Sequence, residues 1–123
     1  MDSRVLHIAY SKALASVAWE THGEHEYVLV GDGVTVDEAI LQDLINSAFS
    51  VATLWSSPSR HRAISVPREE AAHFMATQLV PHSSVILADE SLHTFVELNY
   101  IGVARTGQAR ANYSFQQTRY ARR

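Results

Sequence analysis

The chain has 123 residues, 46% of them hydrophobic and 19% charged, which is enough to fold around a core as one domain spanning residues 1–123. It has no cysteine, and this excludes disulfides, thiol catalysis and cysteine-based zinc sites. The net charge is −3, yet residues 101–123 hold five of the 10 Lys and Arg residues and none of the 13 Asp and Glu residues. An acidic body is therefore followed by a basic tail, a split that suggests a surface for a partner.

The first third of the chain predicts strands, with one segment left open. Residues 4–10 read as a short strand. Residues 13–20 fit either an Ala-rich helix capped by Ser11 or one arm of a hairpin turning at His22-Gly23. Side chains that alternate on both sides of this turn favour the hairpin.

Residues 36–55 predict the longest helix. Thr35 and Glu38 have the spacing of a capping box at its start. Apolar residues then recur three and four apart, as on a helix face that packs on a sheet. These residues are Ile40, Leu41, Leu44, Ile45, Ala48, Phe49, Ala52 and Trp55. Residues 56–59 then end the helix as a connector rich in serine.

The remainder predicts a second helix among strands. A strand over 61–66 precedes a helix that starts at Pro67, with Ala71, Ala72, Met75 and Leu79 on its inner face. Strands are then expected over 83–89, 92–104 and 111–120, with a turn at Thr106-Gly107.

These elements predict an α+β fold: a two-layer sandwich with a mostly antiparallel sheet of about five to six strands and two helices on one face. No stretch is long and apolar enough for a membrane span. The missing cysteines fit a cytoplasmic protein.

Residue patterns that carry chemistry are sparse. There are seven histidines, and four potential ligands crowd the segment 22–26, but a polar hairpin tip explains that segment better than a metal site does. Glu70 and His73 form only half of a di-metal motif. The nucleophile elbow, the Walker loop and the dinucleotide fingerprint do not occur. The sequence therefore assigns no catalytic residue, metal ligand or cofactor, and favours a protein that is not an enzyme.

The C-terminal segment is the predicted functional surface. Arg110, Tyr113, Phe115, Arg119 and Tyr120 combine guanidinium donors with large rigid rings. Such residues are enriched at protein interfaces, and they can also contact phosphates and stack on bases. The alternative is an edge strand whose arginines keep it soluble and unpaired.

We therefore expect a small protein-binding module of the inhibitor, immunity, phage-antagonist or regulatory adaptor type, from a bacterium or phage. Its partner would be another protein or a second copy of the chain. One alternative is a nucleic-acid-associated regulator that uses the basic aromatic strand, although the net negative charge disfavours it. Another is an unrecognised small enzyme or ligand-binding domain whose histidines converge in the fold.

Overall fold

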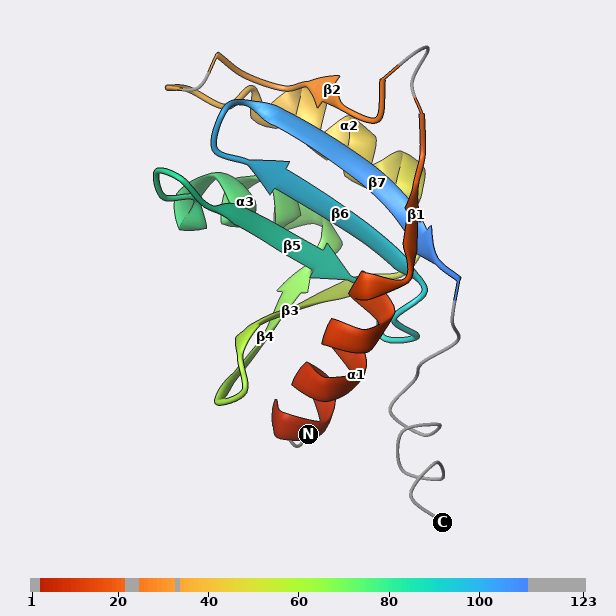
Figure 1. Cartoon of the computed structure of the whole chain (residues 1–123). Coiled ribbons are helices and arrows are strands. Elements are labelled where there is room, and N and C mark those ends of the chain that lie inside the picture. The colour runs from red at the N-terminus through yellow and green to blue at the C-terminus, as the bar shows by residue number, and fades with distance from the viewer. Residues whose placement is uncertain (1–2, 22–24, 33, 111–123) are drawn as a thin grey trace.

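The computed structural model describes residues 3–21, 25–32 and 34–110, which form three α-helices and a seven-stranded antiparallel sheet. The elements in chain order, drawn in Figure 1, are α1 (Ser3–Ala15), β1 (Val17–Trp19), β2 (Val28–Leu29), α2 (Glu38–Ala48), β3 (Thr53–Ser59), β4 (Arg62–Pro67), the 3₁₀ turn η1 (Arg68–Glu70), α3 (Ala71–Gln78), β5 (Ser84–Ala88), β6 (Thr94–Asn99) and β7 (Val103–Ala109). The predicted α+β class is therefore confirmed.

The strands follow the order β1-β7-β6-β5-β3-β4, and β2 also pairs with β7. β1 and β2 lie end to end along one edge of the sheet, because Val17 pairs with Ala109 and Val28 pairs with Ala104. The predicted hairpin would pair these two segments with each other, whereas both pair with β7 and form two parts of one edge. The turn predicted at His22-Gly23 lies outside the described residues.

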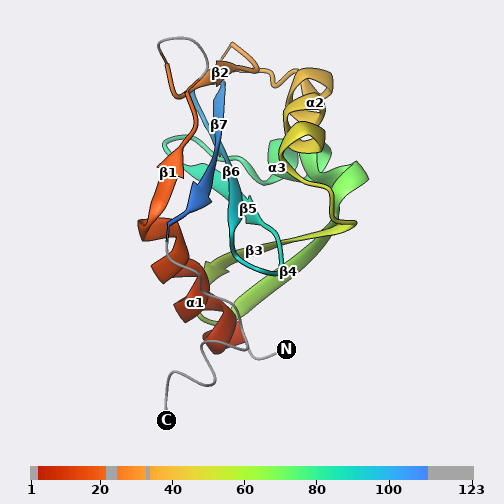
Figure 2. The same ribbon diagram turned by 90° about the vertical axis from the view of Figure 1, so that its right-hand side faces the viewer.

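Helices lie on both faces of the sheet (Figure 2). The core beneath α2 and α3 includes Leu41, Ile45, Met75, Leu87 and Leu98, and the core beneath α1 includes Leu6, Tyr10, Leu92 and Phe95. The sheet contributes side chains to both cores because successive strand residues point to opposite faces. The two predicted helices do share one face, and α1 is an additional helix on the other. Among the described residues, no helix has the length and apolarity needed to cross a membrane.

The strand predicted over residues 4–10 is wrong, because these residues belong to α1. Leu6, Ala9, Tyr10 and Ala13 are buried, and their spacing of three and four residues is that of one helix face. The apolar run at the start of the chain is short enough to fit either structure, and contact with the sheet selects the helix.

The long helix is shorter than predicted at both ends. Asp37, and not a Thr35–Glu38 capping box, caps α2: its Oδ1 accepts the N–H groups of Ala39 (3.1 Å) and Ile40 (3.2 Å). At the other end Phe49 is already extended, with φ −122° and ψ 137°. Of the predicted face, Leu41, Ile45 and Phe49 are buried, Leu44 and Ala48 are half-buried, and Ile40 is exposed.

Trp55 lies in β3 and not in a helix, and residues 56–59 continue that strand. The strands predicted over 61–66 and 83–89 are confirmed as β4 and β5. The second helix is confirmed, with Ala71, Ala72 and Met75 buried, but it begins at Ala71 after η1 and not at Pro67, and Leu79 is its half-buried C-cap. The strand predicted over 92–104 is wrong in extent, because a turn from Asn99 to Gly102 divides it into β6 and β7. The turn predicted at Thr106-Gly107 lies inside β7, and the strand predicted over 111–120 falls outside the described residues.

Candidate functional site

Of the five residues predicted to bind a partner, only Arg110 lies among the described residues. It is exposed, and its backbone N–H donates to the carbonyl of Ser16 (3.1 Å), so the end of β7 is held beside the end of α1. Tyr113, Phe115, Arg119 and Tyr120 lie outside the described residues. The proposed interface at this segment therefore stays a prediction.

Arg105, a residue of β7, contacts side chains on the neighbouring strands and next to the sheet edge. Its Nε donates to Glu97 (2.8 Å) and its Nη1 donates to Glu26 (2.9 Å). The guanidinium carbon also lies 3.9 Å from the ring centre of Trp19 and 5.0 Å from that of Tyr27. With two carboxylates and two rings around it, Arg105 holds Trp19 of β1, and Glu26 and Tyr27 just before β2, against β7. It is therefore not an exposed basic contact.

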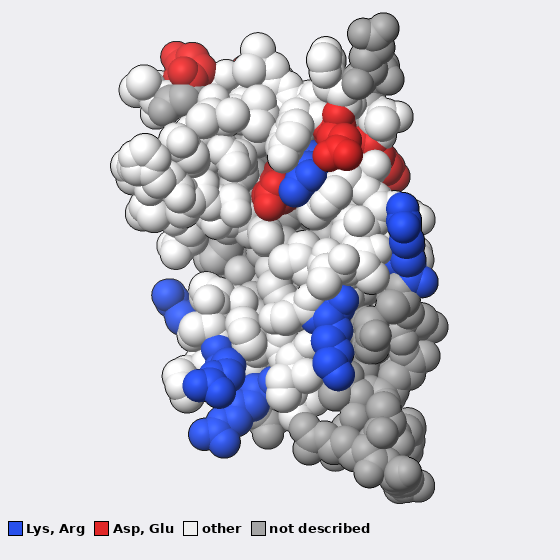
Figure 3. Space-filling view, in the orientation of Figure 1, with Lys and Arg blue, Asp and Glu red and all other residues white. Residues whose placement is uncertain are grey.

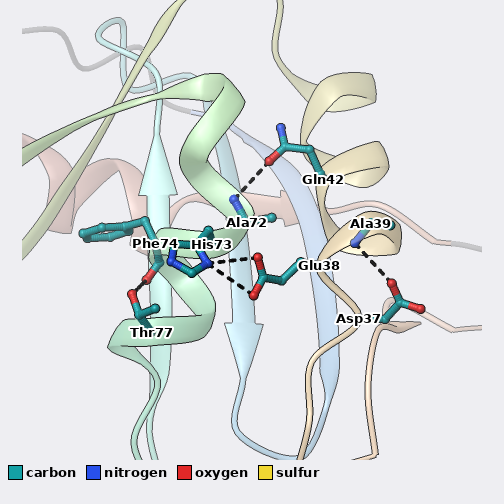
Figure 4. Close-up of polar contacts among 8 residues, drawn as sticks. All are labelled: Asp37, Glu38, Ala39, Gln42, Ala72, His73, Phe74 and Thr77. Carbon is teal, nitrogen blue, oxygen red and sulfur yellow. Dashed lines mark hydrogen bonds and ion pairs between the residues drawn. The ribbon is translucent and has the colours of Figure 1, made fainter.

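The histidines among residues 3–21, 25–32 and 34–110 do not converge on a metal site. His73 Nδ1 lies 3.1 Å from Glu38 Oε1, so its partner is a carboxylate on α2 and not Glu70 on its own turn (Figure 4). The pair is exposed, and it lies beside the bond from the Ala72 N–H to Gln42 Oε1 (3.1 Å) that links α2 to α3. No group of three or more His, Asp or Glu side chains in the described parts of the chain could hold a metal ion.

Aliphatic side chains gather instead at one end of the molecule, where three connections meet. Four residues there are more than half exposed: Leu29 (70%), Val34 (93%), Val80 (57%) and Ile101 (54%). We call these four residues the aliphatic end. They come from β2, the β2–α2 loop, the α3–β5 loop and the β6–β7 turn, and the two loops and the turn lie at the left of Figure 1.

The β2–α2 loop is a hydrogen-bonded turn that exposes the Val34 side chain to solvent. Asp32 Oδ1 accepts the N–H groups of Val34 (2.9 Å) and Thr35 (2.7 Å), and Gly31 forms an antiparallel bridge with Val36. These two N–H donors lower the pKa of Asp32. Only glycine fits at position 31, because a Cβ there would lie 2.4 Å from the Thr35 carbonyl oxygen.

Two further turns complete the aliphatic end. Val80 opens a turn in which the Ser83 N–H donates back to the Val80 carbonyl (3.2 Å), and His82 takes a positive φ of 63°. This backbone conformation is uncommon for a residue other than glycine. Ile101 is at the tip of the β6–β7 turn, which closes through Gly102 at φ 95° and a bond from its N–H to the Asn99 carbonyl (3.0 Å).

A groove of about 380 Å³ runs between these turns. Val34 and Val36 form one wall, and Leu79, Val80 and Tyr100 form the other. Leu29 and Ile101 do not line it; they lie on the adjoining β2 strand and β6–β7 turn, which are joined where the Val30 N–H donates to the carbonyl of Gly102 (2.9 Å). The only charged group lining the groove among the described residues is the acid Glu38, and Asp32 and Asp37 are exposed in the adjoining loop. The site is therefore an aliphatic surface with an acidic border.

The aliphatic end was missed because its residues are far apart in the sequence. A signal was nevertheless present: Val34, Val80 and Ile101 stand beside glycine or proline, at turn positions where polar residues are usual. Comparison of the chain with family models, with curated proteins and with solved structures found no match.

Proposed function

We propose that this protein is a small cytoplasmic binding module of the inhibitor, immunity or regulatory adaptor type that docks on another protein through its aliphatic end. One observation carries the proposal: Val34 and Val80 line one groove with more than half of their surface exposed, and Leu29 and Ile101, exposed to a similar degree, lie on the adjoining strand and turn. Single exposed apolar residues are ordinary on protein surfaces, whereas a cluster with a polar border marks an interaction site.

The turns support this proposal because their geometry does not need aliphatic residues. The β2–α2 loop is closed by the Asp32 carboxylate, which accepts backbone N–H groups, and by the space that Gly31 leaves. The Val34 side chain therefore adds nothing to the closure of the turn. Ile101 likewise stands at a tip whose closure depends on Asn99 and Gly102. Exposed aliphatic residues at such positions raise the risk of aggregation unless a partner covers them.

The chemistry of the border defines the partner. Glu38 lines the groove, Asp32 and Asp37 lie close by in the β2–α2 loop, and no Lys or Arg is among the described residues that line it. A complementary segment would insert an aliphatic or aromatic side chain between Val34 and Val80 and carry Lys or Arg beside it. A nucleic-acid backbone would be repelled by this border, so this surface does not favour the second hypothesis.

Affinity measurements with matched variants test the proposal. The tagged full chain is used to recover a partner from the host organism, and binding of the purified pair is then measured by calorimetry. We expect the double variant Val34→Asp/Ile101→Asp to weaken binding more than about tenfold, because it places charges in a desolvated contact. Val51→Asp is the control, because Val51 is a 40% exposed aliphatic residue that lies after α2, away from the groove. Equal affinities for the three proteins would refute the proposal.

The basic aromatic segment remains a separate candidate surface, which the same assay can test. Alanine at both Tyr113 and Arg119 is predicted to abolish partner binding while the domain stays folded, if Arg110, Phe115 and their neighbours form the interface. Loss of binding in this variant, with full binding by Val34→Asp/Ile101→Asp, would move the interface to the C-terminal segment. Light scattering of the free chain would show whether a second copy is the partner.

A further inference from the structure

A second groove, of about 530 Å³, lies between α1 and the sheet. It forms where the sheet opens: β3 and β5 pair only at Trp55 and Ala88, and beyond this pair the β3–β4 hairpin turns away from β5 (Figure 1). The hydroxyl of Tyr10 bridges this opening by donating to the carbonyl of Ile86 (3.1 Å). The volume is within the range of small-molecule sites.

Two buried serines of β3 line this groove. Ser56 is 6% exposed and Ser57 is 4% exposed. Ser57 Oγ lies 3.0 Å from His7 Nδ1 and 3.3 Å from the carbonyl oxygen of Ser59. Because that carbonyl can only accept, the serine hydroxyl donates to it and His7 Nδ1–H donates to the serine. The Nε2 atom of His7 is then left without a partner among the described residues.

Ser56 has no such arrangement. Its hydroxyl makes no hydrogen bond to any residue within the described part of the chain. Arg68 Nε is the only fully enclosed side-chain polar atom without a partner among the described residues, so the Ser56 oxygen is open to the groove that it lines. A water molecule or a ligand in the groove can bond to it.

The one charged side chain that lines this groove among the described residues, Arg62, is positive. Arg62 has no ion pair with another described residue. Lys12 on α1 and Arg60 in the β3–β4 turn are exposed on the same two elements that form its sides. In the face drawn in Figure 3, the half of the molecule that holds α1 and this hairpin shows Lys and Arg and no acid. A positive rim around a partly enclosed hollow attracts anions.

The lining also has an apolar part, beside further polar side chains such as Gln78 and Ser84. Phe74 of α3, Ile64 of β4 and Leu14 of α1 contribute to the apolar part, so a ligand that fills the groove would bring an apolar body as well as a charged head. We propose that this groove binds a small organic anion, a phosphate or carboxylate ester or acid with an aromatic or aliphatic body. Arg62 and the Ser56 hydroxyl bind its charged group, and Phe74 and Ile64 pack against its body.

Amide NMR spectra of the full chain test the site with three probes: naphthyl phosphate, naphthoate and the neutral naphthylmethanol. We expect both anions to give saturable shifts confined to Ser56, Ser57, Arg62 and Ser84, and to bind about tenfold more tightly than the alcohol. The tighter of the two anions then identifies the head group.

Two variants distinguish binding by Arg62 in the groove from attraction by the overall positive charge of this surface. Arg62→Gln is expected to weaken both anions about tenfold and to leave the alcohol unchanged, because it removes one charge-assisted contact. Arg110→Gln, which alters an exposed arginine that does not line the groove, is the control and should bind as the parent does. Both positions are exposed, so we expect each variant to fold. Dispersed amide signals in the spectrum of each variant will check this.

Three results would overturn the proposal. Absence of saturable binding by either anion would show that the groove is not an anion site. If the alcohol binds as tightly as the anions, and Arg62→Gln changes none of these affinities, the groove is an apolar site without an anion contact. A short oligothymidylate that binds more tightly than naphthyl phosphate, and is weakened equally by Arg62→Gln and Arg110→Gln, would assign this surface to nucleic acid instead.

Discussion

Single residues at close contacts decide the path of the sheet edge. Gly107 belongs to β7 because β1 passes directly over it: a Cβ there would lie 2.6 Å from both the Ala18 carbonyl oxygen and Val17 Cγ1. The sequence predicted a turn at this glycine, since glycine most often marks turns. In a strand it can also mark close approach of another backbone, which no local pattern reveals.

Gly107→Ala is predicted to destabilise the fold by about 1–3 kcal/mol, as overpacking in an interior does. The reason is that Val17 and Ala18 cannot retreat without breaking the β1–β7 ladder. Urea unfolding followed by tryptophan fluorescence measures the loss. The neighbouring Gln108→Ala is the control; Gln108 is exposed, and its replacement should change stability by less than about 0.5 kcal/mol. Equal unfolding midpoints for the two variants would contradict the close contact.

Asp32 makes the β2–α2 turn sensitive to acid. Backbone N–H groups of Thr35 and Val34 hold its pKa below the usual value. Because the folded-state pKa is depressed, the stabilisation is present above the unfolded-state pKa and is lost as the pH falls through the folded-state pKa. We expect the carboxyl carbon of Asp32 to titrate, by NMR, with a midpoint below about 3.9, the value of an unperturbed aspartate. Amide signals of Val34 and Thr35 should shift together with it, and a midpoint at or above that value would argue against this turn.

At the scale of the elements, periodicity predicts the interior of the chain better than its ends. β4, α3 and β5 follow from patterning because Pro67 and the loop after α3 delimit them. α1 does not, because its apolar run before residue 10 fits a strand as well as a helix. The overrun of α2 has the same origin: Ala52 and Trp55 continue the helical spacing by coincidence, while Leu54 and Trp55 face opposite sides of the sheet.

Phe49 tests where α2 ends and how it packs. It is 4% exposed at the C-cap of α2, within the core shared by α2, α3 and the sheet. Phe49→Ala is predicted to cost about 3–5 kcal/mol, because it leaves a cavity that the sheet and the helix cannot close. Denaturant melts measure this loss, with Val51→Ala at a 40% exposed position as the control. A loss below about 1 kcal/mol would be smaller than cavity formation allows and would place Phe49 outside the core.

At the scale of the whole molecule, residues that sequence separates are brought together into two surfaces. Net charge and the basic tail indicated a partner, but they directed attention to residues 110–120. The aliphatic end could not be predicted, because Val34 and Val80 come together only where the fold brings the β2–α2 and α3–β5 loops to the same groove. The second groove, between α1 and the sheet, could not be predicted either, because it depends on a contact between His7 and Ser57, which lie on different elements. Neither surface follows from a local motif.

Cross-linking in the living host is the most direct test of the aliphatic end. A photoreactive phenylalanine analogue replaces Ile101 in one strain and Val51 in another, and each chain is irradiated at its native expression level. The account predicts one discrete protein adduct from position 101, lost when Val34→Asp is added, and no adduct from position 51. Discrete adducts from position 51 alone, or none from position 101 while the partner still co-purifies, would contradict it.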